Sequence, residues 1–100
     1  MKLLMIILDE SVRDEVESVL SRHGVDGYTE IPMVLGEGLS GKKLSSRLHP
    51  GANSIVFTII DDSKLEEIRS ALLATCTGRA SDPGCPKPIH IAVLKVEEFL

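Results

Sequence analysis

The order of apolar segments along the chain constrains its fold more than any other feature of the sequence. Four segments have the length and residue types of strands, and two further segments repeat apolar residues at helical spacing. They follow one another as strand, helix, strand, strand, helix, strand. Right-handed crossovers then give a four-stranded antiparallel sheet. The sequence therefore predicts one α+β domain over residues 1–100, a ferredoxin-like βαββαβ fold with both helices on one face of the sheet.

The expected strands are separated by glycine, proline and polar residues. The first, Lys2–Leu8, is apolar throughout apart from its lysine, which is typical of a strand covered on both faces. The others are expected at Gly27–Leu35, Ser54–Ile60 and Ile89–Val96. Pro32 has no N–H to donate to a neighbouring strand, so it predicts an edge, a bulge or a bend in the second strand.

The first helix is expected between a polar cap and a glycine. Ser11 with Asp14 indicates its start, and Asp9 is an alternative cap. His23 and Gly24 indicate its end, because glycine suits the left-handed conformation that follows many helices. Its expected apolar stripe is Val12, Val16, Val19 and Leu20.

The second helix is expected to begin at a capping box formed by Ser63 and Glu66 and to end near residues 76–78. The preceding Asp61-Asp62 pair is interpreted as part of the cap. The apolar face of this helix is Leu65, Ile68, Leu72 and Thr75, and its solvated charges are Lys64, Glu66, Glu67 and Arg69. Two helices cover one face of the sheet, yet the first and third strands are apolar on both faces. The uncovered face is therefore expected to meet another subunit.

Two glycine-rich segments carry positive charge on a chain whose formal net charge is −4. Segments 36–53 and 77–88 are each net positive and contain six of the eight glycines. Their cations are Lys42, Lys43 and Arg47 in the first segment and Arg79 and Lys87 in the second. Backbone N–H groups of glycine-rich loops approach phosphates closely, so this pattern predicts an anionic ligand. The acidic remainder of the chain argues against nucleic-acid binding.

Nothing in the sequence indicates secretion or a membrane span. No apolar run approaches the ~20 residues that a span needs, and Asp9-Glu10 interrupts the first apolar segment. We expect a cytoplasmic protein that is not inserted in a membrane. Its two cysteines, Cys76 and Cys85, are not a secreted disulfide framework, although they bracket one loop and could form a redox-sensitive disulfide.

Four short motifs, in this order, resemble the PII superfamily of trimeric signalling proteins. They are Gly27-Tyr28-Thr29, Leu35-Gly36-Glu37-Gly38, Thr77-Gly78-Arg79 and Val93-Leu94-Lys95-Val96-Glu97-Glu98. In that family they open the second strand, enter the long T-loop (here 36–53), start the B-loop (here 77–88) and form the last strand. The stretch 49–54 is similar to PII-like proteins associated with heavy-metal efflux transporters.

The resemblance implies a homotrimeric regulator that binds ATP, ADP or AMP between subunits and signals to a partner such as a membrane transporter or an enzyme. The nucleotide-binding residues that it implies are Gly27, Tyr28, Thr29, Gly36, Glu37, Gly38, Thr77, Gly78, Arg79 and Lys87. The implied partner-binding residues are Lys42, Lys43 and Arg47. The chain departs from the family pattern in two places: no arginine follows the last strand, and residues 82–86 replace the glycine-rich B-loop sequence.

A metal site is the main alternative. Cys76, Cys85 and His49 supply ligand types that zinc and copper accept, although the cysteine spacing is not that of a zinc finger. Such a protein would resemble the CutA family of metal-tolerance proteins, which shares the ferredoxin-like trimer. Ser and His residues are present, but no signature joins them into a nucleophile and base, so an enzyme is not expected.

Overall fold

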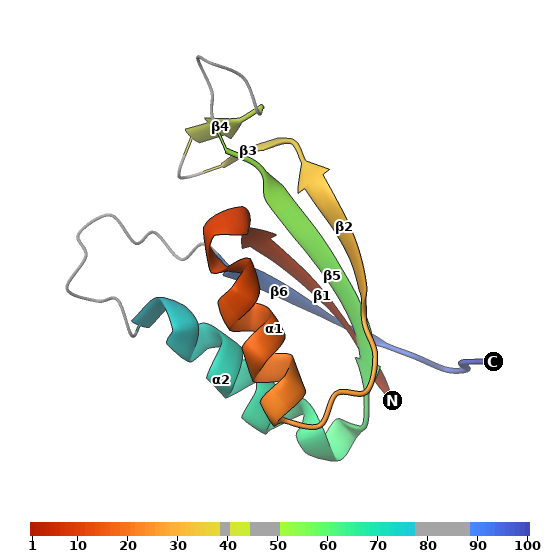
Figure 1. The fold of residues 1–100 in the computed structure, drawn as a ribbon. Helices are drawn as coiled ribbons and strands as arrows, with labels where there is room; N and C mark the ends of the chain where they lie inside the picture. Colours follow the sequence, from red (N-terminus) through yellow and green to blue (C-terminus); the bar gives the residue numbers. More distant parts are fainter. Residues whose placement is uncertain (39–40, 45–50, 78–88) are drawn as a thin grey trace.

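The computed structural model describes residues 1–38, 41–44, 51–77 and 89–100. Four strands form one antiparallel sheet in the order β2-β5-β1-β6, and two helices cover one of its faces (Figure 1). The strands are β1 (Lys2–Asp9), β2 (Thr29–Val34), β5 (Asn53–Ile60) and β6 (Ile89–Lys95). This arrangement confirms the ferredoxin-like α+β prediction.

The central strands β1 and β5 pair along their whole length, from Lys2 opposite Ile60 to Asp9 opposite Asn53. Alternate side chains of both strands therefore point to opposite faces. The helix-covered face is fully buried, and the other face is half-buried. Residue parity thus decides which side chains enter the core.

The helices α1 (Arg13–Arg22) and α2 (Leu65–Thr77) pack their predicted apolar stripes on the sheet. A short 3-10 turn precedes each helix: η1 (Glu10–Val12) and η2 (Asp62–Lys64). The side chains that make up the core are Leu4, Ile6, Leu8, Val12, Val16, Val19, Leu20, Val56, Ile60, Ile68, Leu72 and Ile89. The core is entirely aliphatic.

The caps differ from the sequence-based expectation. The Asp9 carboxylate accepts a hydrogen bond from the Ser11 N–H at 2.9 Å and another from the Ser11 hydroxyl, so Asp9, the alternative, is the cap. The capping box that was predicted at Ser63 is wrong, because η2 extends the helical segment by one turn. Asp61 stands at the cap of that turn, and its carbonyl accepts from the Lys64 N–H at 3.0 Å.

The second strand is shorter than expected and is irregular at the proline. It begins at Thr29 rather than at Gly27, and its register with β5 shifts between Ile31 and Val34. Met33 takes a left-handed conformation with φ of 59° there. A bulge beside Pro32 was one of the predicted outcomes, and the structure confirms it.

Part of the segment that was expected to be an irregular loop is a hairpin. Strand β3 (Gly36–Gly38) pairs with β4 (Gly41–Lys43) in a separate two-stranded sheet. Glycines give strands little side-chain packing, so the sequence pattern did not indicate it. The hairpin projects beyond the end of the main sheet (Figure 1).

The sheet face opposite the helices is apolar and carries no element of the described chain (Figure 1). The half-buried side chains on this open face include Leu3, Met5 and Ile7 of β1 and Ile55, Phe57 and Ile59 of β5. No helix in the described ranges is long and apolar enough to cross a membrane.

Candidate functional site

A cavity lies where the chain passes from α1 to β2. Helix α1 ends at Arg22 and is capped by His23, and Gly24 follows with φ of 74°, as predicted for the helix end. The ammonium of Lys64 donates a hydrogen bond to the His23 carbonyl at 3.1 Å. A Cβ on Gly24 would lie 3.0 Å from that ammonium, so the glycine serves both the backbone conformation and the close approach of Lys64.

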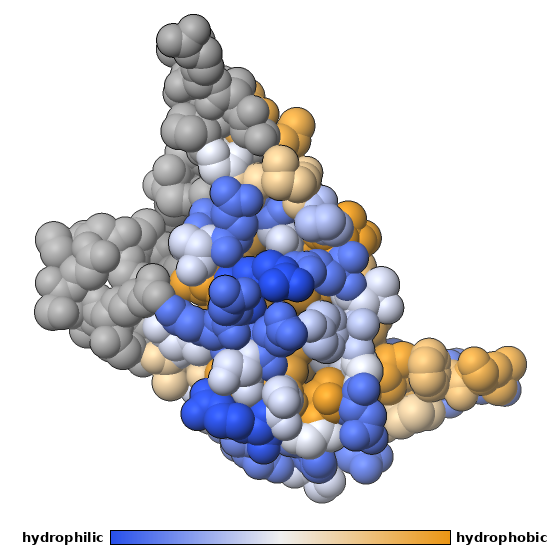
Figure 2. Space-filling view, viewed as in Figure 1, coloured by the Kyte–Doolittle hydropathy of each residue, from blue (hydrophilic) through white to orange (hydrophobic). Residues whose placement is uncertain are grey.

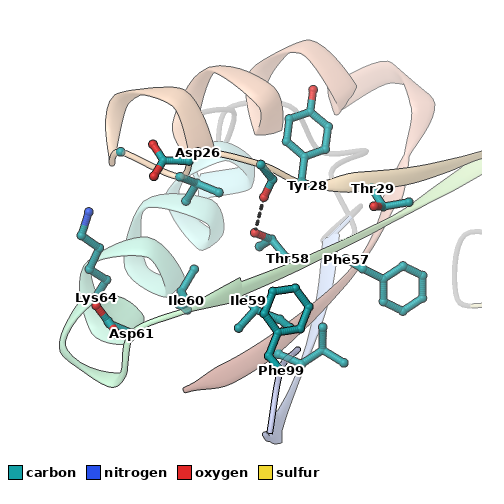
Figure 3. Close-up of a pocket in the computed structure, with 14 residues that line it drawn as sticks. Asp26, Tyr28, Thr29, Phe57, Thr58, Ile59, Ile60, Asp61, Lys64 and Phe99 are labelled. Carbon is teal, nitrogen blue, oxygen red and sulfur yellow. Dashed lines mark hydrogen bonds between the residues drawn. The ribbon is translucent and has the colours of Figure 1, made fainter.

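The connecting segment runs beside β5 without joining the sheet. Thr29 pairs with Phe57, but β5 continues to Ile60 with no ladder partner on this side. The buried Thr58 hydroxyl ties the segment to β5 by donating a hydrogen bond to the Gly27 carbonyl at 2.8 Å. A cavity of about 670 Å³ opens along this free edge of β5 (Figure 3). Ligand pockets commonly fall in this size range.

The cavity has one apolar and one polar wall. Leu3, Ile59 and Phe99 supply apolar surface, while Asp26, Asp61 and Lys64 supply charge (Figure 3). The charged side chains among the described lining residues are two carboxylates and one ammonium. This balance disfavours an anionic group inside the cavity and suits an uncharged group with apolar surface and hydrogen-bonding atoms.

Tyr28 and Thr29, two of the predicted nucleotide-binding residues, line this cavity together with Gly27. The ring of Tyr28 points toward α1 in Figure 3. Burial and the negative charge of Glu17 raise the pKa of Tyr28 above its ordinary value of 10.0, and the positive charge of Arg13 partly opposes them. Tyr28 is thus neutral at physiological pH and can act as a hydrogen-bond donor.

A polar network beside the cavity holds β2 against α1. The Arg13 Nε donates to both carboxylate oxygens of Glu30, at 2.9 and 2.8 Å, and Arg13 Nη1 lies 3.3 Å from Glu17. The Glu30 side chain is only 15% exposed, so its charge requires this partner. The hydrogen bond and the charge of Glu30 raise the pKa of Arg13 further. The network thus anchors the start of β2, directly after Tyr28 and Thr29, beside α1.

A second group of predicted residues lies at the other end of β2. Gly36, Glu37 and Gly38 form β3, and an added Cβ on Gly36 would lie 3.7 Å from the Asn53 amide nitrogen. Helix α2 returns from the cavity end of β5 toward this end, and Thr77 is its last residue. Lys42 and Lys43 of the predicted partner-binding group form part of β4, opposite Glu37 and Gly36.

The structure therefore does not bring the predicted nucleotide-binding residues together in one protomer. Residues 30–35 separate Gly27–Thr29 from the hairpin, and an extended segment of that length spans about 20 Å. Gly78, Arg79 and Lys87 lie outside the described residues, as do Arg47, His49 and Cys85. Cys76 lies within α2. Among the residues that are described, no three His, Cys, Asp or Glu side chains could hold a metal ion together.

The chain matches the family model "Nitrogen regulatory protein P-II" over residues 1–96. It belongs to the P-II family. Solved structures of low sequence identity share the fold of this P-II protein. One is CPII, a nitrogen regulatory PII-like protein from Thiomonas intermedia K12, bound to ADP, AMP and bicarbonate. It has 17% identity and a TM-score of 0.67, over 99% of this chain and 94% of that chain.

A second structure of CPII from the same organism, bound to ADP and bicarbonate, has 21% identity and a TM-score of 0.63 over 97% of this P-II chain and 88% of that one. No curated protein matches the chain. These similarities agree with the fold of the chain.

Sequence reasoning missed several residues of the cavity. Asp61 and Lys64 were interpreted as part of a cap and as a solvated helix charge, and Phe99 was assigned to no element, yet all three line the cavity. Asp61 directly follows the end of a strand, where binding residues are often found, but the same position fitted a helix cap equally well. Phe99 reaches the cavity through tertiary structure alone.

Proposed function

We propose that this P-II family member is a regulatory protein that binds an adenine nucleotide at the interface between the subunits of a homotrimer. The observation that carries the proposal is the separation of its two groups of candidate residues at opposite ends of β2. Neither group alone forms a complete site for base and phosphates. Two protomers packed through their open sheet faces would bring one end of each together.

The cavity at Gly27–Thr29 suits the base end of the nucleotide. Its apolar wall offers contact area, and the free edge of β5 and the hydroxyl of Thr29 offer hydrogen-bonding groups. The phosphates would be bound by the neighbouring subunit, through the glycines of β3 and the cations Arg79 and Lys87 of the segment that follows α2. The ADP-bound and AMP-bound CPII structures support the ligand class.

The signal would pass to a partner through the hairpin. Lys42 and Lys43 lie in the projecting two-stranded sheet, which is separate from the main sheet, and Arg47 follows them in sequence. Ligand binding at Gly36–Gly38 would change the population of hairpin conformations and so the binding of a membrane transporter or an enzyme. We place this function in the cytoplasm.

Isothermal titration calorimetry with ATP, ADP, AMP and cyclic AMP tests the nucleotide claim. The wild-type protein should bind at least one of them. Thr29→Val removes one hydroxyl at the base end, and Arg79→Gln removes a charge at the phosphate end. Thr29→Val should weaken binding by a few-fold, since a hydrogen bond between neutral groups contributes about 0.5–1.5 kcal/mol. Arg79→Gln should weaken it by about tenfold or more, since a hydrogen bond to a charged group contributes about 1.5–3 kcal/mol.

Arg69→Gln is the matched control. It removes a cation from the outer surface of α2 that pairs with Glu66 and does not line the cavity. The affinity of Arg69→Gln for each nucleotide should equal that of the wild type. Absence of both heat and a thermal shift with all four nucleotides would contradict the proposal.

A further inference from the structure

Phe99 reaches the cavity from a distant part of the chain. It follows β6, which is separated from β5 by β1 in the sheet order. Nevertheless its ring lines the cavity with Leu3 and Ile59, which are paired directly across β1 and β5 on the open face. In Figure 3 the ring lies against Ile59, below Thr58. The C-terminal segment therefore contributes an aromatic ring to the apolar wall.

The ring is not part of the hydrophobic core. Phe99 is 66% exposed, and the C-terminal segment forms a hydrophobic projection in Figure 2. Leaving this much aromatic surface in water forgoes favourable burial. A neighbouring protomer packed on the open face would cover part of this surface, and a flat apolar group in the cavity would cover the ring face that lines it.

The other aromatic rings of the chain are less well placed for this. The sequence has one Tyr, two Phe and no Trp, so the remaining rings are Tyr28 and Phe57. Both line the cavity, but in Figure 3 Tyr28 points away from Phe99 toward α1, and Phe57 lies farther along β5 toward Thr29.

We propose that Phe99 is a base-stacking residue, on whose ring the nucleobase of the bound nucleotide lies. The inference rests on the proposed nucleotide-binding function and names the contact that holds the base. Asp26 and Asp61 at the polar wall favour the same orientation, because carboxylates repel phosphates and accept hydrogen bonds from amino groups of a base.

Stacking on an aromatic ring contributes to affinity whatever the base, since every base has a π-face. Because each stacked base contributes to the binding free energy, removing the ring should lower the affinity for the nucleotide by about tenfold. The loss should therefore be similar for ADP and GDP. Inorganic pyrophosphate has no base, so its binding should not depend on Phe99.

Calorimetric titration of Phe99→Ala, Phe99→Leu and Leu100→Ala with ADP and with pyrophosphate tests the inference. Leu100 is the adjacent residue and does not line the cavity, so Leu100→Ala is the matched control. Phe99→Ala should bind ADP about tenfold more weakly than the wild type, Phe99→Leu should be intermediate, and Leu100→Ala should be unchanged. Pyrophosphate affinity should be equal in all four proteins.

A fluorescence measurement gives an independent readout. The chain has no tryptophan, so Phe99→Trp introduces a single reporter at this position. ADP should quench its emission in a saturable manner, because a stacked base quenches indole fluorescence, whereas a Leu100→Trp reporter should respond much less.

The outcomes separate this inference from the function on which it rests. Equal ADP affinity of the wild type and Phe99→Ala, or equal quenching of the two reporters, would overturn base stacking and leave nucleotide binding intact. If the wild type bound no nucleotide, both would be overturned.

Discussion

Tyr28 lies between the cavity and the polar network that joins α1 to β2. Burial and the charge of Glu17 raise its pKa above 10.0. A group whose pKa is raised in the folded protein contributes stability that is present below its unfolded pKa and is lost as the pH rises through the folded pKa. Tyr28 therefore favours the folded state at neutral pH and ceases to do so in alkali.

We predict that the absorbance titration of this single tyrosine has a midpoint above pH 10.0 in the folded protein. Glu17→Gln should shift the midpoint downward, because it removes a neighbouring negative charge. Glu15→Gln on the same helix is the control and should leave the midpoint in place. A midpoint in Glu17→Gln equal to that of the wild type would contradict this account.

The backbone conformation at single residues could be predicted from the sequence where the residue itself or its neighbours determine it. Gly24 adopts the left-handed conformation expected after a helix, and Pro32 lies beside the predicted bulge. Arg13 and Glu30 gave no such signal. They are 17 residues apart, and only the packing of α1 on β2 brings them into contact.

Helix α2 is held to the sheet by two fully buried side chains, Ile68 and Leu72. We predict that Leu72→Ala lowers the free energy of unfolding by about 2–5 kcal/mol, through lost burial and the cavity that remains. The neighbouring Leu73 is exposed, so Leu73→Ala should change stability by less than about 0.5 kcal/mol. Urea denaturation followed by circular dichroism measures both, and similar losses would contradict the assigned face of α2.

The β3–β4 hairpin is a separate sheet and contributes nothing to the main ladder. Gly36 lies close to Asn53, so the ends of the intervening segment can be joined without spanning a large gap. We predict that deletion of residues 39–50 leaves the fold intact and abolishes binding to the partner. Thermal unfolding and a pull-down with the partner measure the two effects. Binding that survived the deletion would show that the partner contacts another surface.

The long elements were predictable because their periodicity is regular. The apolar stripe of α1 and the uninterrupted run of β1 both lie where the spacing of apolar residues indicated. The hairpin was not predictable, since Gly36–Gly38 has little side-chain pattern and is held by backbone pairing. The start of α2 was misassigned because Ser63 fits a cap and a 3-10 turn equally well.

The whole molecule leaves the apolar open face of its sheet uncovered by any described element. We predict that the wild type sediments at about three times its 10.9 kDa chain mass. Ile55→Asp places a charge in the middle of that face and should yield monomers, since an unpaired charge is costly to bury. Leu73→Asp on the outer surface of α2 should remain trimeric. Analytical ultracentrifugation distinguishes these cases, and a monomeric wild type would contradict the prediction.

The sequence indicated both halves of the candidate site but not how they relate in space. Gly27–Thr29 and Gly36–Gly38 are close in sequence, and the family resemblance implied a nucleotide site between subunits without indicating how these residues are arranged. The extended β2 holds them at opposite ends of the sheet. Their separation follows from strand geometry, and a site that combines them requires a second protomer.

Native mass spectrometry with ADP tests most directly the claim that the nucleotide site lies between subunits. The account predicts trimers of the wild type that carry up to three ADP molecules, and Ile55→Asp monomers that carry none at the same concentration. ADP bound equally well to the monomers, or wild-type trimers without ADP, would contradict it.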